Sequence, residues 1–192
     1  SYRAPFAEQL NAHVSFAPYA RTAGDVDRAL SSVETALKKG NVGAVLIEPV
    51  LGRGGCIVPP DAFLTGVSEL AAKHGALVIA DEIWTALGRT GSMVRSTTVG
   101  AHADILCFGK GLGGGMALSA CVAPDEIMSS WAREAEVVHT STHAGSPLAC
   151  VAAIATLDAL RFRRLVVRAR EVGPGILEHF RSELASLRDV VE

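Results

Sequence analysis

The stretch Ile105-Leu-Cys-Phe-Gly-Lys110-Gly-Leu-Gly-Gly-Gly115 joins an apolar segment of strand length to a run of glycines, with one lysine at the junction. Upstream, the apolar segment Ala76-Leu-Val-Ile-Ala80 ends in a similar way on Asp81. A lysine in so apolar a setting needs a lowered pKa or a covalent partner, and both are properties of a lysine that forms a Schiff base. The acid at the end of the neighbouring strand is the group that a protonated pyridine nitrogen needs opposite it.

Composition restricts the classes of protein to which the chain can belong. It has 192 residues, 49% of them hydrophobic, and a formal net charge of −2. This length suits one globular domain with a sizeable core and room for the start of a second. A charge so near zero predicts no attraction to nucleic acid or to an anionic membrane. No apolar run approaches the roughly 18 residues that a spanning helix requires.

The cysteines indicate a reducing compartment. Cys56, Cys107, Cys121 and Cys150 are far apart in the sequence, form no CxxC motif, and three of them lie in apolar stretches. We therefore expect buried, reduced thiols and a cytoplasmic protein. The chain opens at Ser1 without an initiator methionine and closes within a pattern, so we expect it to be part of a longer protein.

Apolar segments and breakers predict an alternation of strands and helices. The expected strands are residues 42–47, 76–80, 105–108 and 118–123. The expected helices are residues 25–37, 61–74, a short one from 124, one over 148–160 continued by a basic segment to 170, and a last one after a break at 173–175. Residues 82–103 are expected to be mostly irregular and functional. Wholly apolar strands that alternate with helices are typical of an α/β fold, a mostly parallel sheet with helices on both faces.

Three of the expected strands are followed by an ionisable residue: Glu48, Asp81 and Lys110. Ligands of such sheets gather outside the carboxyl ends of the strands. The sequence therefore predicts that these three side chains share one site.

Four sequence blocks, taken in order, resemble the signatures of class III (omega-type) aminotransferases, which are pyridoxal-phosphate enzymes of fold type I. The blocks are Glu48-Pro-Val-Leu-Gly-Arg-Gly-Gly55, Ala80-Asp-Glu-Ile-Trp-Thr-Ala-Leu-Gly-Arg-Thr-Gly91, Asp104-Ile-Leu-Cys-Phe-Gly-Lys-Gly-Leu-Gly-Gly-Gly115 and Thr140-Ser-Thr-His-Ala-Gly-Ser-Pro-Leu-Ala-Cys150. The resemblance implies that residues 1–160 are part of the large cofactor-binding domain. It implies that residues 161–192 are a connecting helix and the start of the small C-terminal domain.

The resemblance also implies a role for individual residues. Lys110 matches the lysine that forms the Schiff base with pyridoxal phosphate and later carries the proton, and Asp81 matches the acid that pairs with the pyridine nitrogen. Ile83 matches the branched residue that packs on one face of the ring. Thr142 matches the hydroxyl that reaches the cofactor phosphate of the neighbouring subunit in a homodimer. Glu48 matches the acid on the substrate side.

One cofactor-contacting position departs from the family pattern. Trp84 stands where many relatives carry a glutamine whose amide contacts the hydroxyl of the ring. An indole offers a single donor and more bulk, so the contact at this position is expected to differ.

Two other motifs carry weaker implications. Residues 109–114 fit the dinucleotide pattern GxGxxG, but that pattern requires a helix next, and a strand is expected over 118–123. His139 and His143 are four residues apart without a third ligand, so loop histidines are expected and no metal site.

The favoured activity is transamination from an amine or amino acid to a keto acid or aldehyde. An aminomutase on the same scaffold, and a non-catalytic fragment or subunit whose site a partner chain completes, are the alternatives. The partners expected are therefore a small-molecule amino donor and an acceptor.

Overall fold

The computed structural model describes residues 13–132 and 141–186. Within them, the strands β1 (Ala44–Ile47), β2 (Leu77–Asp81), β3 (Ile105–Phe108) and β4 (Ala120–Val122) form one sheet in the order β1-β2-β3-β4. The first three strands run parallel and β4 is antiparallel to β3. The expected α/β fold with a mixed, mostly parallel sheet is confirmed, and the strands occupy the predicted segments with shorter or slightly shifted ends.

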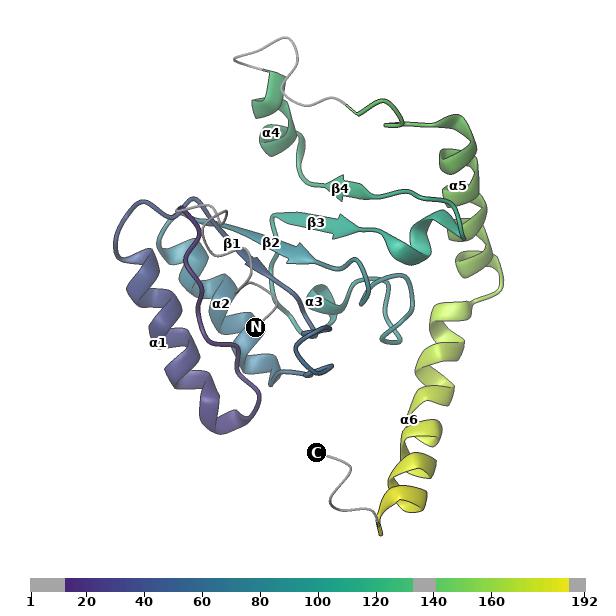
Figure 1. Cartoon of the computed structure of the whole chain (residues 1–192), viewed down its shortest axis with the longest axis horizontal. Coiled ribbons are helices and arrows are strands. Elements are labelled where there is room, and N and C mark those ends of the chain that lie inside the picture. The colour runs from purple at the N-terminus through teal and green to yellow at the C-terminus, as the bar shows by residue number, and fades with distance from the viewer. Residues whose placement is uncertain (1–12, 133–140, 187–192) are drawn as a thin grey trace, which may run out of the picture.

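Two helices cover one face of the sheet. Figure 1 shows α1 (Val26–Leu37) and α2 (Asp61–Lys73) side by side against β1 and β2. Alternate residues of the strands point toward this layer, so that Val78 is buried in the core between the sheet and these helices. The remaining strand residues point to the opposite face, where Leu46 of β1 is 68% exposed. The principal core therefore lies between α1, α2 and the first half of the sheet.

The three parallel strands end side by side at the carboxyl end of the sheet. Ile47 lies opposite Ala80 in the β1–β2 pair, and Asp81 lies opposite Cys107 in the β2–β3 pair. Because the strands run in the same direction, their carboxyl ends are aligned in space although 61 residues of sequence separate the last residue of β1 from the last residue of β3. This alignment positions the candidate site.

The other elements connect the strands or follow them. They are α3 (Arg95–Thr98), the 3-10 turn η3 (Lys110–Gly113), α4 (Asp125–Met128), the 3-10 turn η4 (Ser129–Ala132), α5 (Pro147–Phe162) and α6 (Leu165–Leu184). A further 3-10 turn, η2 (Ala23–Asp25), precedes α1. The connection after β2 is mostly turns, as expected, and contains the short helix α3. None of the helices in residues 13–132 and 141–186 is long and apolar enough to cross a membrane.

The predicted helix break at residues 173–175 is wrong. Helix α6 continues through Pro174, which lies inside it. A proline in a helix removes one hydrogen bond and crowds the carbonyl four residues earlier, which bends or weakens the helix but does not by itself end it. Gly173 and Gly175 have open space around them, so the chain can adjust on both sides of the proline.

Helix α6 packs against the connection that follows β2. A Cβ atom added to Gly91 would lie 3.1 Å from Cα of Arg170, and one added to Gly88 would lie 3.3 Å from a methyl of Val166. The guanidinium of Arg170 donates a hydrogen bond to the carbonyl of Gly91 at 2.9 Å. This close approach requires glycine at position 91, where φ is +76° as well.

We predict opposite effects for substitutions of two glycines, Gly91 inside this contact and Gly173 outside it. Gly91→Ala places a side chain in the left-handed region, at a cost of about 1–2 kcal/mol, and pushes it against α6. Gly173→Ala adds a methyl to an open position inside α6 and should raise the free energy of unfolding by up to about 1 kcal/mol. Denaturant unfolding of both variants checks this, and equal effects of the same sign would contradict the packing described.

Candidate active site

A cavity of about 520 Å³ lies at the carboxyl ends of the parallel strands. Glu48 after β1, Asp81 at the end of β2 and Lys110 after β3 all line it, as the strand order predicts. Its lining residues are Glu48, Gly52, Arg53, Cys56, Asp81, Ile83, Trp84, Ala86, Leu87, Arg89, Lys110 and Gly111. The cavity therefore gathers carboxylates, an amine and guanidinium groups beside apolar side chains.

Lys110 stands at the rim of this cavity. It is the first residue of η3 and has φ of +43°, a left-handed conformation that is uncommon for a residue with a side chain. The expectation that this lysine lies deep in an apolar setting is wrong for the described residues, because β3 ends at Phe108 and Lys110 is exposed. Backbone strain of this kind is concentrated at functional sites, where surrounding contacts hold the residue in place.

Asp81 and Ile83 form the wall beside the lysine. The Oδ1 atom of Asp81 accepts a hydrogen bond from the backbone N–H of Ile83 at 3.1 Å, which fixes the turn after β2. A Cβ atom added to Gly109 would lie 3.3 Å from Cγ2 of Ile83, so the branched side chain packs directly on the glycine next to Lys110. The absence of a side chain at position 109 thus lets the wall and the lysine meet.

Glu48 is held by contacts on both its carboxylate and its backbone. Its Oε2 atom accepts a hydrogen bond from the N–H of Gly52 at 3.0 Å, and its carbonyl accepts one from the hydroxyl of Tyr19 at 2.8 Å. Burial raises the pKa of Tyr19, and the negative charge of Glu48 raises it further, so this phenol stays protonated as a donor. These contacts fix Glu48 in the wall of the cavity.

Trp84 is committed to the protein rather than to a ligand. Its Nε1 atom donates a hydrogen bond to the carbonyl of Val50 at 3.1 Å. A Cβ atom added to Gly52 would lie 3.1 Å from the indole, so the ring packs closely on this loop. The single donor of Trp84 is therefore used, and what the side chain offers to the cavity is its apolar surface.

Glu82 is a buried residue that holds the connection after β2 in place, although the sequence analysis assigned it no role. Its side chain is 1% exposed, and its carboxylate accepts hydrogen bonds from the N–H and the hydroxyl of Ser96 at 2.7 and 2.8 Å and from the hydroxyl of Thr85. A buried carboxylate is costly unless it is hydrogen-bonded, so these donors fix the fold of the whole connection. Its place beside Asp81 at a strand end was the available signal.

Thr142 and the histidines lie apart from the cavity. Thr142 is exposed in the turn before α5 and is not among the residues that line the cavity of its own chain. His143 is exposed next to it, and His139 lies outside the described residues. The structure therefore brings together five of the six candidate residues and leaves Thr142 on the surface.

Arg53, Cys56 and Arg89 also line the cavity, although sequence reasoning did not select them. Each lies in one of the stretches that gave the resemblance or just beside it, so the signal was their position in these loops. The two guanidinium groups add donors that suit carboxylate or phosphate oxygens.

The expectation of buried thiols is wrong for two cysteines. All four are free, as expected, but Cys56 and Cys121 are exposed and Cys107 and Cys150 are half-buried. Cys56 lies in the loop that borders the cavity, and Cys121 lies on the last strand of the described sheet. An apolar neighbourhood in sequence does not bury a residue when no element packs over it.

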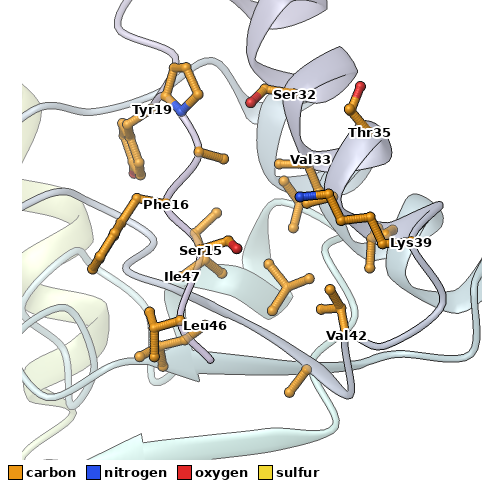
Figure 2. A pocket seen from close by; sticks show the side chains of 18 of the residues that line it. Ser15, Phe16, Tyr19, Ser32, Val33, Thr35, Lys39, Val42, Leu46 and Ile47 are labelled. Atoms are coloured by element: carbon orange, nitrogen blue, oxygen red, sulfur yellow. The ribbon is translucent and has the colours of Figure 1, made fainter. Parts of the chain in front are cut away.

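A second, larger cavity of about 1070 Å³ has a different chemistry. Figure 2 shows Phe16 and Leu46 on one side of it and Val33, Thr35 and Lys39 on the other. No carboxylate is present among the side chains that line it, and it contains none of the candidate residues. The smaller cavity at the strand ends is therefore the candidate active site.

The family model for "Aminotransferase class-III" matches residues 1–192. The chain belongs to the class III aminotransferases. This finding agrees with the fold and with the cavity at the strand ends.

Solved structures support the same assignment. The chain is 35% identical to ornithine delta-aminotransferase from Plasmodium falciparum, with a TM-score of 0.76 over 81% of this chain and 40% of that one. It is 39% identical to acetylornithine aminotransferase from Elizabethkingia anophelis, with a TM-score of 0.72 over 83% and 39%. It is 31% identical to an (S)-enantioselective omega-transaminase from Thermomicrobium roseum, with a TM-score of 0.79 over 88% and 40%. The chain thus spans about 40% of the length of these relatives.

We predict that the class III chain is destabilised when Glu82 is replaced. Glu82→Ala leaves the buried N–H of Ser96 and its hydroxyl without an acceptor, at about 1–3 kcal/mol for each unsatisfied group. Denaturant unfolding measures the loss. Glu69→Ala, at an exposed position of α2, is the matched control and should unfold like the parent protein. Equal stabilities of the two variants would show that Glu82 does not organise the connection.

Proposed function

We propose that this protein is a pyridoxal-phosphate-dependent aminotransferase that moves an amino group from an amine or amino acid to a keto acid or aldehyde. The observation that carries the proposal is the meeting of Lys110 and Asp81 in one cavity at the carboxyl ends of β2 and β3, in a chain of the class III family. The similar ornithine aminotransferase from Toxoplasma gondii has partial occupancy of PLP at its active site.

The side chains of the cavity suit pyridoxal phosphate. They supply one primary amine at Lys110, one half-buried carboxylate at Asp81, and the branched apolar side chain of Ile83 beside both. We infer that Lys110 would hold the cofactor covalently through its amine, that Asp81 would keep the pyridine nitrogen protonated, and that Ile83 would pack on the ring. Trp84 would add an apolar wall. When bound, pyridoxal phosphate supplies an electron sink for the bonds at the substrate α-carbon.

Lys110 is the group placed to move a proton in the reaction. Its amine stands at the rim of the cavity on a turn that its glycine neighbours and its own strained backbone define. A positioned acid–base group of this kind contributes about 10²–10⁴-fold to a rate. We assign to Lys110 the transfer of the proton at the substrate carbon.

The substrate side of the cavity carries charge of both signs. Glu48, Arg53 and Arg89 line the same cavity, and one carboxylate oxygen of Glu48 accepts the hydrogen bond from Gly52. We propose that Glu48 faces the substrate and that the guanidinium of Arg89 attracts acidic substrates. The names of the similar structures make ornithine, acetylornithine and simple amines the first donors to examine.

Thr142 is the candidate residue that we assign to the active site of a neighbouring subunit. It is exposed and away from the cavity of its own chain, which suits a hydroxyl that reaches the cofactor phosphate of a neighbouring subunit. We therefore propose a homodimer. We propose a cytoplasmic location because all four cysteines are free. We further propose that residues 1–160 are part of the large domain and that residues 161–192 connect to a small C-terminal domain. Arg164, with φ of +52° between α5 and α6, lies near this boundary.

The aminomutase alternative gains no support from the similar structures, whose names describe transaminases.

Covalent trapping tests the lysine. Borohydride treatment of the purified protein with pyridoxal phosphate should fix the cofactor to Lys110, as mapped by mass spectrometry of peptides. Lys110→Ala should abolish the adduct, because no other lysine lines the cavity. Lys39→Ala, at the other cavity, is the matched control and should leave the adduct unchanged. An adduct that persists in Lys110→Ala would overturn the assignment.

Neutralising Asp81 tests the electrostatic part of the proposal. Asp81→Asn keeps an oxygen that can accept the hydrogen bond from Ile83, so the fold should be retained. It removes the charge opposite the pyridine nitrogen, and we expect kcat to fall by about 10²–10³-fold. Glu48→Gln should instead act mainly on KM, because Glu48 is assigned to the substrate. Steady-state kinetics with amino donors and a keto acid acceptor measure both, and unchanged kcat in Asp81→Asn would exclude the role.

A further inference from the structure

Two cysteines lie opposite each other on neighbouring strands, in line with a residue of the candidate site. Asp81 of β2 is paired with Cys107 of β3, and Cys107 is paired with Cys121 of β4. Residues directly opposite each other in a sheet point to the same face. The three side chains therefore form one row across the sheet, on the face opposite α1 and α2.

The backbone hydrogen bonds decide how close the two cysteines are. The carbonyl of Cys107 accepts a hydrogen bond from the N–H of Glu82 at 3.0 Å, so the polar backbone groups of Cys107 face β2. In a strand, the N–H and the carbonyl of one residue point to the same side. Cys107 and Cys121 are therefore a non-hydrogen-bonded pair of the antiparallel β3–β4 ladder, in which the Cα atoms are about 4.5 Å apart and the side chains approach most closely. This separation falls in the range of roughly 4.4–6.8 Å that disulfides span.

The two thiols differ in access. Cys121 is exposed, whereas Cys107 is half-buried. Burial raises the pKa of the Cys107 thiol, and the neighbouring Cys121 and Asp81 raise it further. Because it is the more exposed of the two, Cys121 is the thiol that a dissolved reagent meets first.

We propose that Cys107 and Cys121 form a redox-sensitive thiol pair, which closes to a disulfide when the protein meets a low-molecular-weight disulfide. The Cys121 thiolate attacks the small disulfide, forms a mixed disulfide and releases one small thiol. The Cys107 thiolate then attacks the Cys121 sulfur, breaks its bond to the small molecule and releases a second small thiol. The two protein thiols are oxidised, the small disulfide is reduced, and the two protein protons end on the released thiols.

The bond would enclose the turn that carries the catalytic lysine of the proposed function. Residues 108–120 lie between the two cysteines and contain η3 with Lys110 at its start. Closing the bond ties β4 to β3 around this turn and converts the thiol next to Asp81 into a disulfide. The pair is thus a modification site next to Asp81, which lines the cavity, and its existence does not depend on the reaction that the cavity performs.

Disulfide mapping tests the pair directly. The purified, fully reduced protein is incubated in buffers with a rising ratio of oxidised to reduced glutathione, quenched by alkylation, digested and examined by mass spectrometry. We expect a crosslinked Cys107–Cys121 peptide to accumulate while the alkylated forms of both peptides disappear together, and dithiothreitol to reverse it. Cys56, exposed in the cavity loop, is the internal comparison and should carry at most a glutathione adduct.

Single substitutions separate this pair from general thiol oxidation. Cys121→Ser, at an exposed position, should abolish the crosslink and leave Cys107 alkylated, whereas Cys56→Ser should leave the yield of the crosslink unchanged. A parent protein in which Cys121 stops at the glutathione adduct while Cys107 remains alkylated would overturn the proposal. So would a crosslink that joins either cysteine to Cys56 or Cys150 instead. The mapping on the parent protein is decisive even if a variant fails to fold.

Discussion

The parallel register of β1, β2 and β3 brings the ends of the three strands together. Ile47 lies opposite Ala80 and Asp81 lies opposite Cys107, so all three strands end at the carboxyl end of the sheet. The rest of the site depends on this register. A shift by one residue would turn Asp81 to the core face and a buried valine or alanine to the cavity, because side chains alternate between the faces of a strand. The buried contacts of Val78 and its neighbours with α1 and α2 hold the register in place.

The adjacent acids Asp81 and Glu82 have different roles in the site. Asp81 lines the cavity, while Glu82 is buried and accepts hydrogen bonds from Ser96 and Thr85. The first acid is available to a ligand because the second holds the connection below it. Glycines allow the same connection and the lysine turn to pack closely on their neighbours, as at Gly109 against Ile83 and at Gly114, where an added Cβ would lie 2.5 Å from the hydroxyl of Thr156 in α5. The turn at Lys110 is thus fixed from two sides.

Ionisable side chains line the cavity, and the two cysteines of the proposed thiol pair lie on the strands beside it. Lys110, Asp81 and Glu48 line the cavity and are the acid–base groups that the proposed amino-transfer reaction would use, and Arg89 lines the same cavity. Cys107 lies in β3, the strand that precedes the lysine turn, and in the same row as Asp81. A change of oxidation state at Cys107 therefore occurs within one strand spacing of a residue assigned to the cofactor, which is how chemistry at the sheet surface can reach the site.

The sequence by itself determined the strands and the residues that follow them. Ile105–Phe108 was located to the residue, and Glu48, Asp81 and Lys110 were selected, because an apolar run ended by a polar residue is a local pattern. Glu82 as the buried acceptor, the indole hydrogen bond of Trp84, the exposure of Lys110 and the pairing of Cys107 with Cys121 were decided only by the tertiary structure. Each depends on which strands pair and in what register. That choice is made by contacts between residues distant in sequence, which no local pattern records.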